Sequence, residues 1–176
     1  MRLKTITLTV VAAGACASLS GRAQTPPITN PLDAIPDAMP FDTPYGAPIS
    51  LEVAEHAIAA AVAEAKKHNW RLNVAVVDSG TNLVGFQRMD GAQLASIAIA
   101  QHKARAAASF RRETRVFEDS IQLKQNYYAL TLDGVIASRG GIPLIEGGKL
   151  IGAIGCSGGT GSQDEVACKA GAATVR

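Results

Sequence analysis

The stretch IPLIEGGKLIGAIGC, residues 142–156, is the strongest evidence for how this chain folds. Two apolar runs rich in Ile and Leu flank Gly147 and Gly148, and a Gly-Gly pair suits the positive φ values of a two-residue hairpin turn. The stretch therefore predicts a β-hairpin with strands at residues 142–145 and 150–156.

Upstream of this hairpin the sequence predicts two helices and a second hairpin. Apolar residues at helical spacing follow Ser50, a plausible N-cap, and predict a helix to about Lys67; the alanine-rich stretch 94–110 predicts another. Strands at residues 72–77 and 83–89 are expected to pair across the turn between them. Opposite its apolar stripe, the first helix carries small side chains of mixed polarity, which suits close packing against another helix or another subunit.

The remaining segments complete an α+β fold. We expect a loop and a short helix over residues 115–130, a short strand at residues 135–138, and a final helix. Ser162 with Glu165 three residues later matches a capping box for that helix. This order of elements predicts an antiparallel sheet with helices packed on it.

The N-terminal part of the chain has a different character. A basic start, an apolar run and a small-residue site predict a signal peptide at residues 1–23, and hence a periplasmic or secreted protein. Residues 24–48 are rich in Pro and predict an extended arm, which either lies on a surface or is a loose tether. The mature domain is then residues 49–176.

Charge and composition exclude some partners. The formal net charge is only +2, and no basic run is interleaved with aromatic residues. We therefore expect no nucleic-acid partner, and no membrane association after the signal peptide is cleaved.

The sequence has three histidines and no Cys-x-x-Cys-His motif, so any haem would be bound without covalent attachment. His56 and His102 are each either a plain surface residue or an axial ligand to haem iron. His68 lies at a helix end, where a cation is favourable, and needs no other role.

Three charged residues lie near predicted strand ends: Asp78, Arg88 and Asp90. They are either turn caps and a surface ion pair, or a polar rim that holds a carboxylate ligand such as a haem propionate. The Gly-rich loop 157–162 enters a helix N-terminus, but a tight turn explains it better than an anion site. Export permits a disulfide between Cys156 and Cys168, and the sequence leaves this pairing open.

Taken in order, these motifs resemble the GlcG/HbpS family and the C-terminal domain of PduO-type corrinoid adenosyltransferases. The resemblance is carried by VAVVDSG (74–80), FQRMDGA (86–92), KAR (103–105), GGIP (140–143) and IGAIGCSGG (151–159). It implies a profilin-like α/β sandwich that commonly forms oligomers. It also implies haem binding, which in some relatives is linked to haem degradation or redox sensing.

Together with the predicted signal peptide, the resemblance favours an exported, oligomeric haem- or tetrapyrrole-binding protein. His56 or His102 would then meet the iron near a subunit boundary, and Arg88 and Lys103 would hold the propionates. The alternative is a small cofactor-free enzyme, an isomerase, hydrolase or lyase acting on an organic acid. Its base would be Asp78 or Asp90, with Arg88 as the anion clamp. Whether the protein is an enzyme stays open at this point.

Overall fold

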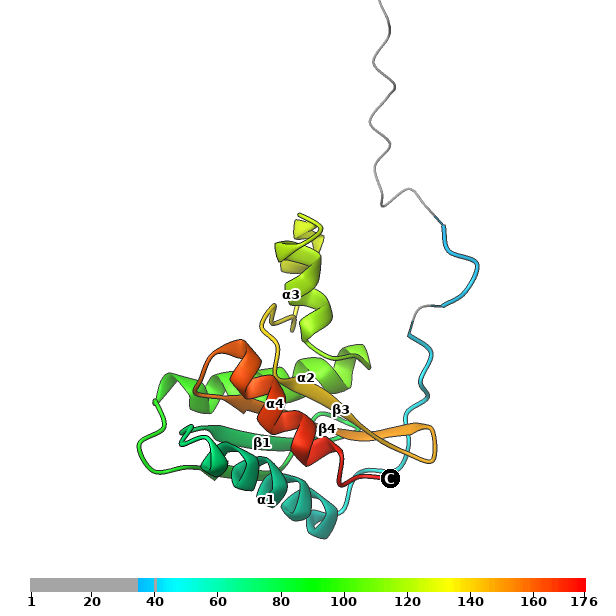
Figure 1. The fold of residues 1–176 in the computed structure, drawn as a ribbon. Coiled ribbons are helices and arrows are strands. Elements are labelled where there is room, and N and C mark those ends of the chain that lie inside the picture. Colours follow the sequence, from blue (N-terminus) through cyan, green and yellow to red (C-terminus); the bar gives the residue numbers. More distant parts are fainter. Residues whose placement is uncertain (1–34, 40) are drawn as a thin grey trace, which may run out of the picture. The chain divides into compact units, whose positions relative to one another are not determined.

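The computed structural model describes residues 35–39 and 41–176, so the predicted signal peptide and most of the first half of the arm lie outside the described residues. Within the compact unit Ala38–Arg176, helices pack on both faces of one antiparallel sheet, and the predicted α+β fold is confirmed (Figure 1). In chain order the elements are α1 (Leu51–Lys67), β1 (Asn73–Asp78), β2 (Leu83–Arg88), α2 (Ala95–Phe110), α3 (Arg115–Gln122), η2 (Tyr127–Thr131), β3 (Gly141–Glu146), β4 (Lys149–Ser157) and α4 (Gly161–Ala172).

The strands lie in the order β2-β1-β4-β3, and every neighbouring pair is antiparallel. Strands β1 and β4 are central and almost completely buried, whereas β2 is an edge strand with several exposed residues. A register shift between Val76 and Val77 of β1 interrupts its pairing with β2. On its outer side, β2 pairs with no other strand of residues 35–39 and 41–176.

Alternation along β1 divides the core between the two faces of the sheet. Val74 and Val76 pack in the cluster beneath α1 and α4, while Ala75 and Val77 pack beneath α2. Helix α2 contacts β4, β1 and β3. A side chain at Gly155 of β4 would collide with the backbone of α2, so glycine at this position lets the helix lie directly on the sheet.

The small second face of α1 packs against a helix of the same chain. A Cβ at Gly171 of α4 would lie 2.6 Å from the carbonyl oxygen of Ala57, so the two helices touch closely. Of the two partners expected for this face, another helix or another subunit, the structure provides the helix.

The C-terminal hairpin is confirmed, and its turn residues Gly147 and Gly148 have φ values of 54° and 75°. The disulfide left open by the sequence is present. Cys156 of β4 and Cys168 of α4 are both buried, with Cα atoms 5.7 Å apart, and their bond ties the last helix to a central strand.

Two local predictions are wrong. Residues 135–138 form no strand, because side chains satisfy the backbone of this region: the Thr114 hydroxyl donates to the Ser138 carbonyl, and Glu118 accepts from the Arg139 N–H. The capping box of α4 is formed by Thr160 and Gln163, two residues before the predicted pair.

The end of the predicted arm belongs to the domain rather than to a loose tether. The Tyr45 hydroxyl donates to the Ser109 carbonyl at 2.8 Å, and the Arg112 guanidinium lies 3.2 Å from the centre of the Phe41 ring. Backbone hydrogen bonds join residues 44–49 to the start of β4. None of the helices in residues 35–39 and 41–176 is long and apolar enough to span a bilayer.

Candidate functional site

The two predicted iron ligands lie on opposite sides of the sheet. His56 is exposed on α1, on the side of the helix that faces away from the core. His102 is exposed on α2, and its Nε2 atom lies 3.2 Å from the Gly134 carbonyl oxygen. One chain therefore does not bring these histidines to a common site, and each faces solvent.

Lys103 is not available to a propionate, and that prediction is wrong. Its side chain is 1% exposed, and Nζ donates to Asp164 Oδ2 at 2.8 Å. A Cβ at Gly140 would come within 3.2 Å of Nζ, so the glycine leaves room for the ammonium to lie inside the fold. The lysine joins α2 to α4 through a desolvated ion pair and has a structural role.

The Gly-rich loop before α4 is a capped turn, as the sequence favoured. Asp164 Oδ1 accepts from the Gly159 N–H at 3.0 Å, Gln163 accepts from the Thr160 N–H, and Thr160 accepts from the Gln163 N–H. These three amides are already paired, so they are not available to an anion.

Asp78 and Arg88 lie at opposite ends of the first hairpin. Arg88 pairs with Asn73 at the start of β1, whereas Asp78 ends that strand. The Asp78 carboxylate also accepts from the backbone N–H groups of Gly80 and Asn82, which makes it a turn cap. The structure therefore contradicts a site built from Asp78 and Arg88, while Asp90 does lie near Arg88.

A groove runs between α1 and the edge strand β2, and we call it the α1–β2 groove. It consists of three adjoining cavities of about 360, 310 and 200 Å³. The first cavity is lined by Leu51, Glu55, Ile58, Gly85, Phe86 and Gln87; the second by Val62, Lys66, Gln87, Arg88, Met89 and Asp90; the third by Lys66, Asn69, Trp70, Arg71 and Met89. The first and second cavities share Gln87 as a lining residue, and the second and third share Lys66 and Met89.

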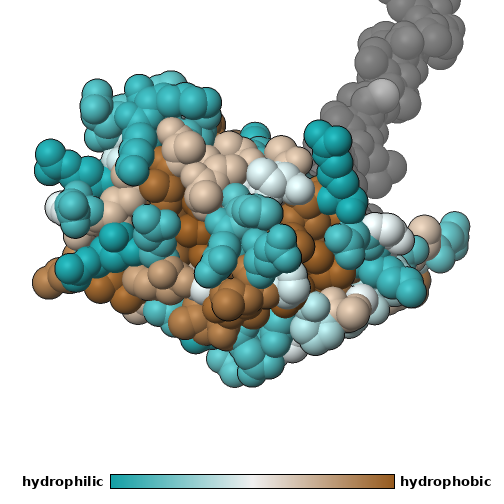
Figure 2. Space-filling view, turned by 90° about the horizontal axis from the view of Figure 1, so that it is seen from below, coloured by the Kyte–Doolittle hydropathy of each residue, from teal (hydrophilic) through white to brown (hydrophobic). Residues whose placement is uncertain are grey.

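Gly85, which lines the first cavity, lets α1 lie close to β2. The Ile58 side chain lies 2.8 Å from where a Cβ of Gly85 would be, so α1 seats against the strand at this point. Figure 2 shows the domain from below the view of Figure 1, which is the side where α1 lies. On this face hydrophobic side chains are exposed among polar ones. The exposed apolar residues of the groove include Leu51, which is 56% exposed.

The two ends of the groove differ in charge. Glu55 lies in the first cavity, while Lys66, Arg88 and Arg71 line the second and third, where Asp90 is the one acidic residue. The basic end can therefore bind acid groups, and the apolar residues beside it can contact a hydrophobic ligand.

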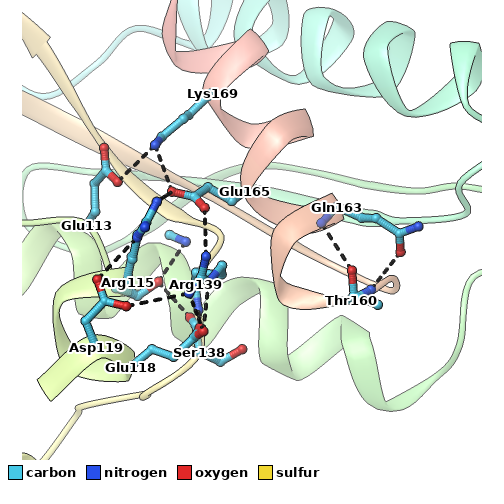
Figure 3. A network of polar contacts seen from close by, with 12 residues as sticks. Glu113, Arg115, Glu118, Asp119, Ser138, Arg139, Thr160, Gln163, Glu165 and Lys169 are labelled. Atoms are coloured by element: carbon cyan, nitrogen blue, oxygen red, sulfur yellow. Dashed lines mark hydrogen bonds and ion pairs between the residues drawn. The ribbon is translucent and has the colours of Figure 1, made fainter. Parts of the chain in front are cut away.

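A second group of charges, shown in Figure 3, is fully paired and is structural. Arg139 lies between Glu118 on α3 and Glu165 on α4, and Lys169 contacts Glu165 at 2.7 Å. Burial acts to raise the pKa of Glu118, but hydrogen bonds from Arg139 outweigh it and hold this pKa below its usual value. The hydrogen bond that the Arg139 guanidinium donates to Glu118 is the main cause of the raised pKa of Arg139. The network fastens α3 to the sandwich.

No group of three His, Cys, Asp or Glu side chains in the described part of the chain is placed to hold a metal ion. Sequence reasoning identified Arg88 and Asp90 of the groove but missed Lys66, Trp70 and Arg71. A signal for Lys66 was present, because it continues the helical stripe of Leu51, Ile58 and Val62 at the spacing of one helix face.

Comparison with known proteins relates the chain to a family. A family model described as "Haem degrading protein HbpS-like" matches residues 49–173. The Escherichia coli K12 protein GlcG is 39% identical over 108 residues, which cover 61% of this chain and 80% of GlcG. The crystal structure of HbpS matches with a TM-score of 0.69 at 32% identity, covering 74% of this chain and 92% of HbpS. A crystal structure of PduOC in complex with haem matches with a TM-score of 0.67 at 28% identity, covering 73% and 96% of the two chains.

Proposed function

The chain belongs to the HbpS-like family, and we propose that it is an exported, oligomeric protein that binds haem or a related tetrapyrrole. The observation that carries this proposal is the α1–β2 groove, where apolar side chains adjoin a cationic end that includes Arg88. A structural relative has been crystallised as a complex with haem. The basic and apolar start of the sequence supports export to the periplasm or the medium.

The residues of the groove fit such a ligand. A tetrapyrrole presents a flat apolar ring and acid groups, and these require apolar contacts and cations respectively. Leu51, Ile58 and Phe86 offer the first, and Arg88 offers the second. When bound, haem would supply redox chemistry at its iron, and the protein would supply binding and orientation.

His56 and His102 stay our candidate iron ligands, but neither lines the groove of its own chain, so the histidine that meets groove-bound haem would come from a second subunit. Because both are exposed, either one is enclosed only where a second subunit covers it. The proposal therefore links haem binding to self-association, and linkage of this kind makes haem affinity depend on protein concentration.

The test is a titration of the purified mature protein with haemin, followed by Soret absorbance and by size-exclusion chromatography. We expect a shifted Soret band that is lost or strongly altered in the His56→Ala, His102→Ala double variant. The His68→Ala variant is the matched control and should keep the band. An unshifted Soret band would refute haem binding, and a band unchanged in the double variant would refute this choice of ligand.

A second candidate is the cofactor-free enzyme acting on an organic acid. One observation favours it: Asp90 and Arg88 line the same cavity, so a carboxylate base lies near an anion clamp. Under this hypothesis Asp90→Asn abolishes turnover of the acid, whereas haemin binding needs no base at this position.

A further inference from the structure

Three cations from three different elements converge at one end of the α1–β2 groove. Lys66 comes from the last turn of α1, Arg71 from the α1–β1 connection and Arg88 from the end of β2. Lys66 and Arg88 line one cavity, and Lys66 and Arg71 line the adjoining one. Residues distant in sequence thus place positive charge around a single concave surface.

These three cations are not used by the fold. Within residues 35–39 and 41–176, none of them is within ion-pair distance of a carboxylate, and none donates a side-chain hydrogen bond. By contrast, two nearby basic residues in the sequence are paired: Lys67 and His68 contact Glu64 at 2.7 and 3.2 Å. Asp90 is the one acid that lines these cavities, so the positive charge there is only partly balanced.

The surface between the cations is partly apolar and includes an aromatic ring. Trp70 stacks on His68 with ring centres 4.4 Å apart and an angle of 18° between the planes. Met89 adjoins both cavities, and its sulfur accepts the Leu72 N–H at 3.5 Å. These contacts fix the aromatic and thioether groups in place before any ligand arrives.

The Arg71 side chain is also positioned by the backbone. It lies across Gly91, where φ is +75°, and a Cβ there would be 3.0 Å from Arg71 Cδ and 3.1 Å from its Nη1. A residue other than glycine would be strained at this φ and would crowd the guanidinium. The turn after β2 thus leaves room for the Arg71 side chain, which also lines the third cavity.

We infer that Lys66, Arg71 and Arg88 form the acid-binding subsite of the groove, and that it takes the carboxylates of a flat, apolar di-acid lying over Trp70 and Met89. The inference rests on the proposed function in one respect, since a tetrapyrrole with two propionates belongs to this class of ligand. It goes further because it names the three cations that bind the acid groups and excludes Lys103 as one of them.

The experiment compares haemin with haemin dimethyl ester, which has the same ring and iron but no free acid. We expect the Lys66→Gln, Arg71→Gln, Arg88→Gln triple variant to bind haemin about 10–100-fold more weakly than the wild type, since several charge-assisted contacts are lost. The wild type should bind the ester as weakly as the triple variant binds haemin, and the triple variant should not distinguish the two. Arg105→Gln and Lys124→Gln remove exposed cations outside the groove and should leave both affinities unchanged.

The outcomes separate this inference from the proposed function. If haemin binds and neither the variant nor the ester weakens binding, the subsite is refuted while haem binding stands. If haemin does not bind the wild type, haem binding fails, and naphthalene-2,6-dicarboxylate then decides the subsite. Trp70 is the single tryptophan of the chain, so its fluorescence reports this ligand directly. A fluorescence change that the triple variant lacks supports the subsite, and no change in the wild type refutes it.

Discussion

Removing one partner of the buried ion pair between Lys103 and Asp164 should be among the most destabilising single changes in this domain. The lysine side chain is 1% exposed and the aspartate side chain 3%, and each charge has the other as its ion-pair partner within the described residues. Removing one partner leaves an uncompensated charge in a desolvated site. Lys103→Met and Asp164→Asn should therefore each lower the free energy of unfolding by about 3–5 kcal/mol.

The double variant distinguishes a buried charge from lost packing. Met has nearly the length of the lysine stem, and Asn can still accept the Gly159 N–H that Asp164 now accepts. Lys103→Met, Asp164→Asn contains no buried charge, so its loss should be well below the sum of the two single losses. We expect a coupling free energy of about 2–4 kcal/mol, as for contacting groups of a buried network.

The assay is urea unfolding of the four proteins, followed by circular dichroism, with m-values checked for agreement. In thermal unfolding each single variant should lose about 10–15 °C, because 1 kcal/mol shifts the midpoint by roughly 3 °C in a domain of this size. Additive losses in the double variant, or single losses below about 1 kcal/mol, would contradict the argument. Either result would mean that water or another group compensates these charges.

Two further predictions concern the disulfide and the charge network. The Cys156–Cys168 bond spans 12 residues, so the Cys156→Ala, Cys168→Ala double variant should lose about 3 kcal/mol of the free energy of unfolding measured in urea. Dithiothreitol should lower the stability of the wild type but not that of the variant. Equal stability of the two proteins would refute a stabilising role for the bond. Burial acts to raise the pKa of Glu118, but its Arg139 contacts lower the pKa overall, so this stabilisation is complete above the unfolded-state pKa and is lost as pH falls through the folded-state pKa. Below about pH 5 the thermal midpoint should fall less steeply in Glu118→Gln than in the wild type or in the exposed Glu146→Gln control, and parallel curves would contradict this assignment.

The sequence predicted those parts of the fold that depend on local pattern. The Gly147–Gly148 turn, the stripe of α1 and the alanine-rich α2 follow from turn chemistry and periodicity, and the structure confirms all three. The strand expected at residues 135–138 failed because short apolar runs do not reveal their partners. In the structure Thr114 and Glu118 satisfy that backbone from elsewhere in the chain.

The site was harder to predict, because tertiary position decided the role of each charge. Lys103 and Arg105 lie two residues apart on α2. No sequence pattern shows that the lysine side chain is buried while the arginine side chain is exposed. Its partner Asp164 lies 61 residues away. Lys66 and Arg71 likewise look like ordinary surface cations until β2 places Arg88 beside them. His56 and His102 are exposed on their helices and neither lines the groove, which the sequence could not show.

The motifs that carry the family resemblance separate into two groups once their positions are known. Gly140, Gly155 and the Lys103–Asp164 pair are explained by close packing and by one buried ion pair, so they identify the fold and require no ligand. The run 86–92 is different: four of its residues, Phe86 to Met89, line the groove together with Asp90, although packing on an exposed edge strand does not demand Gln, Arg and Asp there. Polar groups that the fold leaves unused beside an apolar surface are the ones available for binding. We therefore expect the recognition chemistry of this domain at the α1–β2 groove, whereas the glycine-rich loop before α4 is a capped turn.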